Sequence, residues 1–264
     1  MARETGGKNI RTRSSSLIDG TLKIDFPPDI LHQVIANNLD LCELKALLFT
    51  HAHDDHFSGA ELQYLGPYFV TEKLAEPLPV YGPPEVIDWL TVHLKLDRLP
   101  LTLHTLTPWK TVCIDCYHVT PLLAQHDPST TCFNYLIEDR QGTTLLYATD
   151  TGWYEEETWQ FLQNYNLDGI VVECQKGLQD NGYQGHLSIA DVIRLRQRLI
   201  ESGNFASERL CAVTHLSHLT GLAHADWEAQ LLPYNIQTGY DGMTLEVAPP
   251  SPTERRRRRL HKKE

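Results

Sequence analysis

The chain has 264 residues, of which 41% are hydrophobic, and carries 23 basic and 34 acidic side chains for a net charge of −11. It is long enough to bury a full core in one large or two small domains. No apolar run reaches the roughly 18 residues of a membrane span, and residues 1–8 lack the apolar core of a signal peptide. Six cysteines spread through apolar segments favour free thiols over a disulfide framework, which predicts a cytoplasmic protein.

Hydrophobic periodicity predicts strands and helices in turn along the chain. In the first half, we expect a hairpin at 17–25, a helix at 29–39, a buried strand at 44–50, a helix at 58–65, a strand at 79–82 and a helix at 83–96. Then come strands at 102–106, 112–120, 132–138 and 143–148, a helix at 155–164, a strand at 169–173, a helix at 188–201, a strand at 210–214, a helix at 225–232 and a strand at 243–247. Such alternation indicates an α/β fold with sheets covered by helices.

The densest group of polar side chains follows the strand at 44–50. Three imidazoles and two carboxylates fall within six residues there: His51, His53, Asp54, Asp55 and His56. Imidazole and carboxylate are ligands for zinc, manganese and iron. His51 and His53 project to one side, as residues two apart do in extended chain, and Asp55 and His56 can hold a second ion.

The order His-x-His-x-Asp-His resembles the signature of the metallo-β-lactamase superfamily. That resemblance implies an αββα four-layer sandwich, with further metal ligands at the ends of later strands. Matching residues stand at those places: His126, Asp150 and His215. One ion would then take His51, His53 and His126; the other would take Asp55, His56 and His215; and Asp150 would bridge them.

A narrower resemblance rests on residues 9–18, 80–84, 185–188, 214–218 and 240–243. These segments are similar to the cyclic-phosphate phosphodiesterase of the carbon–phosphorus lyase pathway and its relatives. Members of that family usually open with a glycine-rich strand and a cysteine cluster for a structural zinc. The chain begins beyond that point, so we expect both features to be missing or replaced.

The same resemblance brings His186 to the metals, where a histidine can donate a proton near neutral pH. His186 and Asp55 are therefore the candidate catalytic residues, Asp55 being a metal ligand as well. His218 and Asp241 are candidates for orienting a ligand histidine, since metal-bound imidazoles usually donate their other N–H to an acceptor.

Together these residues predict a hydrolase of a small phosphodiester, cyclic or not. Two divalent ions, Zn²⁺ or Mn²⁺, would share a hydroxide that attacks phosphorus. Three alternatives stay open: a lactonase or thioesterase, an RNA-processing nuclease, and a metal-binding protein without catalysis. The partner is then a small molecule, and a homodimer is among the oligomeric states left open.

Charge separates residues 1–248, the predicted hydrolase domain, from a tail at 249–264. The tail is rich in proline and then basic, with seven basic and one acidic residue in the last ten, so the rest of the chain has a net charge of −17. We expect the tail to be disordered and unnecessary for turnover of small substrates. A body this acidic disfavours long polyanions, so nucleic acid would be contacted only through the tail.

Overall fold

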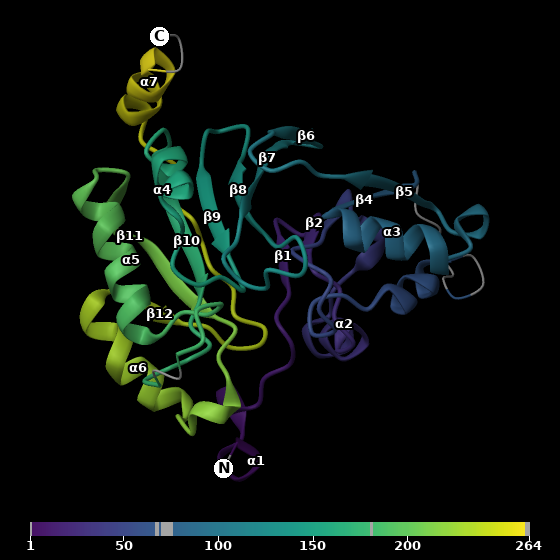
Figure 1. The fold of residues 1–264 in the computed structure, drawn as a ribbon, viewed down its shortest axis with the longest axis horizontal. Helices are drawn as coiled ribbons and strands as arrows, with labels where there is room; N and C mark the ends of the chain where they lie inside the picture. The colour runs from purple at the N-terminus through teal and green to yellow at the C-terminus, as the bar shows by residue number, and fades with distance from the viewer. Residues whose placement is uncertain (1, 67–68, 70–75, 180–181, 262–264) are drawn as a thin grey trace. The chain divides into compact units, whose positions relative to one another are not determined.

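The structure is a computed structural model that describes residues 2–66, 69, 76–179 and 182–261. The chain divides into two compact units, each built around its own sheet (Figure 1). The five-stranded unit comprises residues 11–110 and 127–133, and the seven-stranded unit comprises residues 1–10, 111–126 and 134–264. The predicted α/β class, with two sheets and helices, is confirmed. The extent of a single domain over 1–248 stays a prediction.

The five-stranded sheet has the order β1-β2-β3-β4-β5. The predicted hairpin is present as β1 (Ser16–Ile18) and β2 (Leu22–Ile24), which are antiparallel. β3 (Ala46–Leu48), β4 (Leu78–Gly82) and β5 (Leu101–Thr105) then follow in parallel. The helices are α2 (Ile30–Asn37) and α3 (Pro84–His93), and α3 packs against β4 and β5.

The helix predicted at 58–65 is instead a 3-10 helix, Gly59–Leu65. Its first residue explains part of the difference. Gly59 lies so close to the Trp89 ring of α3 that a side chain would collide with it. The segment is therefore pressed against α3, and this tertiary contact overrides the local helical pattern.

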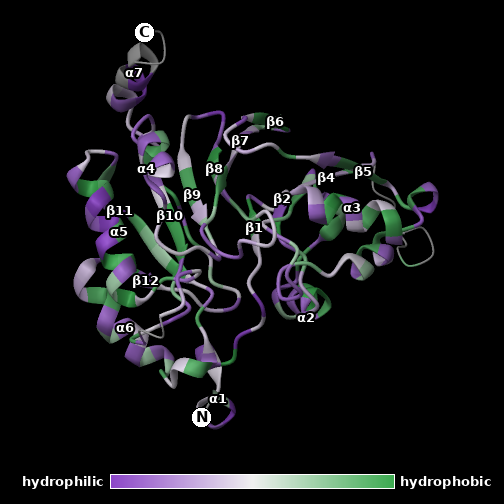
Figure 2. Ribbon diagram, viewed as in Figure 1, coloured by the Kyte–Doolittle hydropathy of each residue, from purple (hydrophilic) through white to green (hydrophobic). Residues whose placement is uncertain are grey.

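The seven-stranded sheet has the order β12-β11-β10-β9-β8-β7-β6. Its strands are β6 (Val112–Ile114), β7 (Tyr117–Leu123), β8 (Phe133–Glu138), β9 (Thr144–Ala148), β10 (Leu167–Glu173), β11 (Phe205–Thr214) and β12 (Gln237–Thr238). The strands from β9 to β12 run parallel, and β10 is almost entirely buried, as its hydrophobic colour in Figure 2 suggests. The unit's helices are α1 (Ala2–Thr5), α4 (Glu156–Leu162), α5 (Ile189–Glu201), α6 (His224–Leu231) and α7 (Pro252–His261). α5 packs against β11 and α6 against β12 (Figure 1).

Two strand predictions in this unit are wrong. The strand expected at 112–120 is the hairpin β6–β7, which turns at Asp115, where a φ of 49° lies in the left-handed region. Cys113 and Cys116 therefore flank a turn. The strand expected at 243–247 is not formed, because Val247 packs over Gly169 of β10 instead of pairing at an edge.

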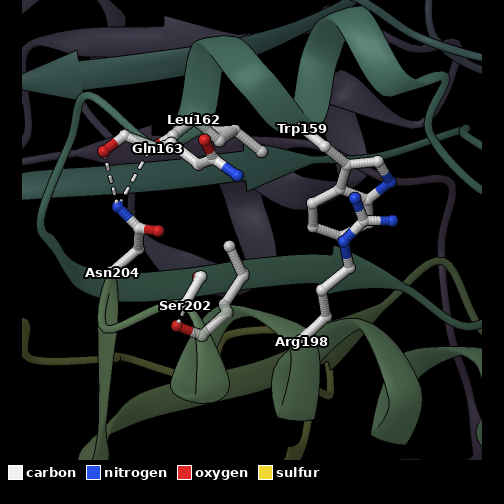
Figure 3. A pocket seen from close by; sticks show the side chains of 7 residues that line it. Trp159, Leu162, Gln163, Arg198, Ser202 and Asn204 are labelled. Carbon is white, nitrogen blue, oxygen red and sulfur yellow. Dashed lines mark hydrogen bonds between the residues drawn. The ribbon is translucent and has the colours of Figure 1, made fainter.

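Asn204 ties the end of α4 to the chain that follows α5 (Figure 3). Its amide donates to the carbonyls of Leu162, Gln163 and Tyr165 at 3.3, 3.0 and 2.7 Å. Leu162 is the last residue of α4, and its carbonyl also accepts from Tyr165 N at 3.0 Å, so these contacts stabilise the C-terminus of the helix. The hollow beside Asn204 is small, with room for a water-sized molecule, and is lined by residues in and just after α4 and α5.

The basic tail is helical through His261, as α7, and is docked on its own unit, contrary to the expected disorder. Arg258 forms a two-pronged ion pair with Asp168, with N–O distances of 2.7 and 2.9 Å. The Asp168 side chain is fully buried, and Arg209 approaches it at 3.5 Å. Arg209 also binds Glu254 of α7 at 3.1 Å. The last three residues of the predicted tail lie outside the described residues.

Arg258→Ala should therefore lower the free energy of unfolding by about 1.5–3 kcal/mol, the range for hydrogen bonds to a charged group. In this variant Arg209 still lies near the buried Asp168 carboxylate, which limits the cost of losing the Arg258 charge. Urea denaturation of Arg258→Ala and of Arg256→Ala provides the measurement, because Arg256 is an exposed arginine of the same helix. Equal stability in the two variants would show that the tail does not dock through Asp168.

All six cysteines are described and are free thiols, as predicted. Among the described residues, no helix has the length and apolar character needed to cross a membrane. The cytoplasmic location stays a prediction.

Candidate metal centre

The five-stranded unit carries the histidine-rich turn directly after β3. His51 and His56 are fully buried, and their ring centroids are 4.5 Å apart. The His53 ring lies at the same distance from His51. Asp55 is more exposed, with a carboxylate oxygen 3.6 Å from His56 Nε2. The four predicted ligands of this turn therefore form one cluster at the end of a central strand.

Asp25, which follows the neighbouring parallel strand β2, fixes His56 in this cluster. His56 Nδ1 donates to Asp25 Oδ2 at 2.7 Å, and both side chains are fully buried. The carboxylate also accepts from Thr50 N at 2.8 Å and from the Thr50 hydroxyl. A buried carboxylate on Nδ1 orients the ring and leaves Nε2 for a metal.

Asp127 orients the His53 ring as Asp25 orients the His56 ring. His53 Nε2 lies 3.0 Å from Asp127 Oδ2, which leaves Nδ1 as the metal-binding nitrogen. The Ser129 hydroxyl and the Ser129 backbone N–H hold the pKa of the Asp127 carboxyl well below its usual range, and His53 adds to the effect. Asp127 therefore stays an acceptor.

In the seven-stranded unit, Asp150 lies between two predicted ligand histidines. Asp150 Oδ1 is 3.3 Å from His215 Nε2, and Oδ2 is 3.6 Å from His126 Nε2. Asp150 comes two residues after β9, and His215 directly follows β11. The carboxyl ends of parallel strands meet at one edge of a sheet, which explains why residues 65 positions apart are neighbours. Each oxygen faces a different histidine, as a bridging carboxylate requires.

The backbone at these positions is unusual. Asp25, Asp150 and His215 have φ values of 59°, 52° and 53°, in the left-handed region that residues other than glycine seldom adopt. Each of them comes at the end of a strand in its own unit. Such backbone strain gathers at functional sites, where it aims a side chain that regular structure would turn elsewhere.

His186 is 9% exposed and is paired with Glu173, the last residue of β10. His186 Nδ1 donates to Glu173 Oε1 at 2.6 Å, and backbone N–H groups of Thr151, Gln175 and Leu187 donate to the same carboxylate. Burial raises the pKa of the Glu173 carboxyl and the nearby Asp150 charge adds to the rise, while His215 and the backbone hydrogen bonds from Gln175 and Thr151 lower it.

The donor set fits divalent metal ions. Within the seven-stranded unit, donor atoms of His126, Asp150 and His186 all lie within 4.8 Å of one another, and so do those of Glu173, His186 and His215. Imidazole and carboxylate in such groups suit zinc and manganese. His186 belongs to both groups, so its place outside the ligand set stays a prediction.

The roles of His218 and Asp241 in orienting a ligand histidine stay predictions. His218 begins a 3-10 helix, His218–Thr220, and is exposed, as is Asp241. Several groups contact predicted ligands: Asp25 binds His56, Asp127 binds His53, and Thr50 Oγ1 lies 2.9 Å from His51 Nδ1. The Gly185 carbonyl accepts from His126 Nδ1 at 2.9 Å. None of these groups, nor Glu173, was predicted from the sequence. A carboxylate that closes an apolar strand was the available signal for Asp25 and Glu173.

Comparison with known proteins assigns the family. The model of the beta-lactamase superfamily domain matches residues 21–205, so the chain belongs to the beta-lactamase superfamily. This membership implies divalent metal ions as cofactors. No curated protein sequence matches the chain.

Solved structures show the same fold. A diphosphatase from the PhnP family is 20% identical with a TM-score of 0.70, over 93% of this chain and 89% of that one. The metallo-beta-lactamase fold protein YhfI from Bacillus subtilis is 20% identical with a TM-score of 0.67, over 89% and 92%. Human tRNase Z, short form, is 14% identical with a TM-score of 0.64, over 89% and 93%. The metallo-β-lactamase fold is thereby confirmed.

Proposed function

We propose that the protein is a metal-dependent hydrolase of a small phosphodiester. The observation that carries the metal-dependent part is the placement of Asp150, whose two oxygens face His126 and His215 separately. The phosphodiester part rests on the motifs at 185–188 and 240–243 and on the likeness to a diphosphatase from the PhnP family.

Seven residues would hold two divalent ions: His51, His53, Asp55, His56, His126, Asp150 and His215. Paired ions of this kind lower the pKa of a coordinated water and polarise phosphoryl oxygens. Asp25, Asp127 and the Gly185 carbonyl fix the ring orientation of His56, His53 and His126, so the ligand nitrogens need little rearrangement on binding.

His186 would protonate the leaving alkoxide. The Glu173 carboxylate holds Nδ1–H of His186, and this hydrogen bond sets the orientation of the ring and the position of its other nitrogen. Asp55 is the most exposed of the seven predicted ligands, with 44% of its side chain exposed, which suits a second role beside the substrate.

Substrate class is tested by metal analysis of the purified protein followed by a panel assay. The panel contains bis(p-nitrophenyl) phosphate, a 2′,3′-cyclic nucleotide, p-nitrophenyl phosphate, a lactone and a thioester. We expect kcat/KM to be highest for a diester, since a singly charged diester can bridge two cations and leave room for a bound water. A lactone or thioester turned over faster than every diester would refute the phosphodiesterase assignment and leave the fold and metal site standing.

A further inference from the structure

The segment Gly182–His186 holds His126 in two places within the seven-stranded unit. His126 Nδ1 donates to the Gly185 carbonyl at 2.9 Å. The Tyr183 hydroxyl donates to the His126 carbonyl at 3.2 Å. The ring and the main chain of a predicted metal ligand are thus both bound by the same short segment.

The segment is itself anchored to the end of β10. Lys176, only 6% exposed, donates from Nζ to the Tyr183 carbonyl at 3.1 Å. His186, at the other end of the segment, is bound to Glu173 at 2.6 Å. Both anchors come from residues at or just after the end of β10, so the contacts to His126 are made from a fixed position.

The backbone of Gly185 packs closely against the Tyr183 hydroxyl and the His126 carbonyl. A Cβ atom at Gly185 would lie 2.5 Å from the Tyr183 hydroxyl and 2.6 Å from the His126 carbonyl oxygen. Real Cβ atoms do not approach other atoms so closely, so the glycine lets the two chains come together. The Tyr183 ring also lies 5.6 Å from the His186 ring, between centroids.

We propose that Tyr183 is a positioning residue for metal binding, because its hydroxyl fixes the main chain from which the His126 imidazole reaches the ion. The proposal rests on the proposed function, in which His126 is a ligand. Groups that orient a metal ligand typically change metal affinity by about 10- to 100-fold when they are removed. Tyr183 acts through His126 and is given no contact with substrate.

The test compares Tyr183→Phe with Tyr234→Phe. The two tyrosines are 46% and 47% exposed, so each variant loses one hydroxyl from a half-exposed ring. Affinity for Zn²⁺ and for Mn²⁺ is measured by competition with a chromogenic chelator, and the midpoint of thermal unfolding is measured on metal-free protein. We expect Tyr183→Phe to weaken one binding step about 10- to 100-fold, with Tyr234→Phe unchanged and both metal-free midpoints close to that of the parent.

A second variant disturbs the same contact by steric crowding. Gly185→Ala places a methyl group against both the Tyr183 hydroxyl and the His126 carbonyl, so it should weaken the same binding step. Parental affinity in Tyr183→Phe would overturn the proposal. A lowered metal-free midpoint together with unchanged affinity would also overturn it, since the hydroxyl would then serve folding alone.

The outcomes separate this proposal from the proposed function. A parent protein that binds no divalent ion refutes both. A parent that binds two ions and hydrolyses a diester, with full affinity in Tyr183→Phe, refutes only the role of Tyr183. A parent that binds metal without hydrolysing any diester, with weakened affinity in Tyr183→Phe, supports the role of Tyr183 and refutes the phosphodiesterase.

Discussion

Replacing Asp150 with alanine should lower the metal content of the protein from two ions per chain to one or none and reduce diester turnover by about 10³-fold or more. The two carboxylate oxygens lie 3.3 Å from His215 Nε2 and 3.6 Å from His126 Nε2, so one side chain serves both predicted ions. A metal contributes several kcal/mol to transition-state stabilisation, and each 1.36 kcal/mol is about a factor of ten in rate.

Metal content is read by inductively coupled plasma mass spectrometry after gel filtration, alongside turnover of bis(p-nitrophenyl) phosphate. Asp97→Ala is the matched control, because it removes a carboxylate that is 77% exposed. Asp150→Asn separates charge from shape, since the amide keeps one acceptor oxygen and loses the negative charge. Two ions per chain and parental turnover in Asp150→Ala would show that Asp150 does not bridge the metal ions.

The sequence predicts where the candidate ligands lie in the fold when a polar side chain closes an apolar strand. Asp150 and His215 follow β9 and β11, and parallel strands bring their carboxyl ends to one edge of the sheet. The histidine-rich turn after β3 obeys the same rule. Strand ends could be located from hydrophobic runs, and the resemblance to the superfamily indicated which of these ends carry candidate ligands.

The contacts that orient the ligands depend on distances in space that the sequence does not give. Asp25 contacts His56, which is 31 positions away in the sequence, and Asp127 contacts His53, which is 74 positions away. The Gly185 carbonyl is a backbone group, which has no residue type to signal it. Asp25 and Glu173 do follow or close strands, yet a single carboxylate beside a strand is common without any function.

Individual residues also explain two errors in the predicted elements. Residues 112–120 alternate as one strand would, but Asp115 adopts a left-handed conformation and turns the chain back. The tail has the composition of a disordered segment, but one of its arginines finds the buried carboxylate of Asp168. At Asp115 the deciding residue forms a local turn, whereas Arg258 acts through a partner 90 positions away in the chain.

Replacing His186 with alanine should lower the turnover of an alkyl phosphodiester by about 10²–10⁴-fold, the usual contribution of general acid catalysis, and leave two ions bound. His186 is 9% exposed and tied through Nδ1 to Glu173 at 2.6 Å, an arrangement that holds the ring in one orientation. The loss should shrink for bis(p-nitrophenyl) phosphate, since p-nitrophenolate leaves readily without a proton. His32→Ala, which removes an exposed imidazole from α2, is the control.

Metal analysis of the same variant decides between two roles for His186. The residue shares a donor group with His126 and Asp150 and another with Glu173 and His215, so a ligand role is the physical alternative to an acid. A ligand would be needed equally for every substrate, and its loss would release an ion. An acid would leave the ions in place and make the penalty grow as the leaving group becomes more basic. Loss of metal from His186→Ala, or an equal loss of rate for alkyl and p-nitrophenyl diesters, would therefore show that His186 is a metal ligand and not the proton donor.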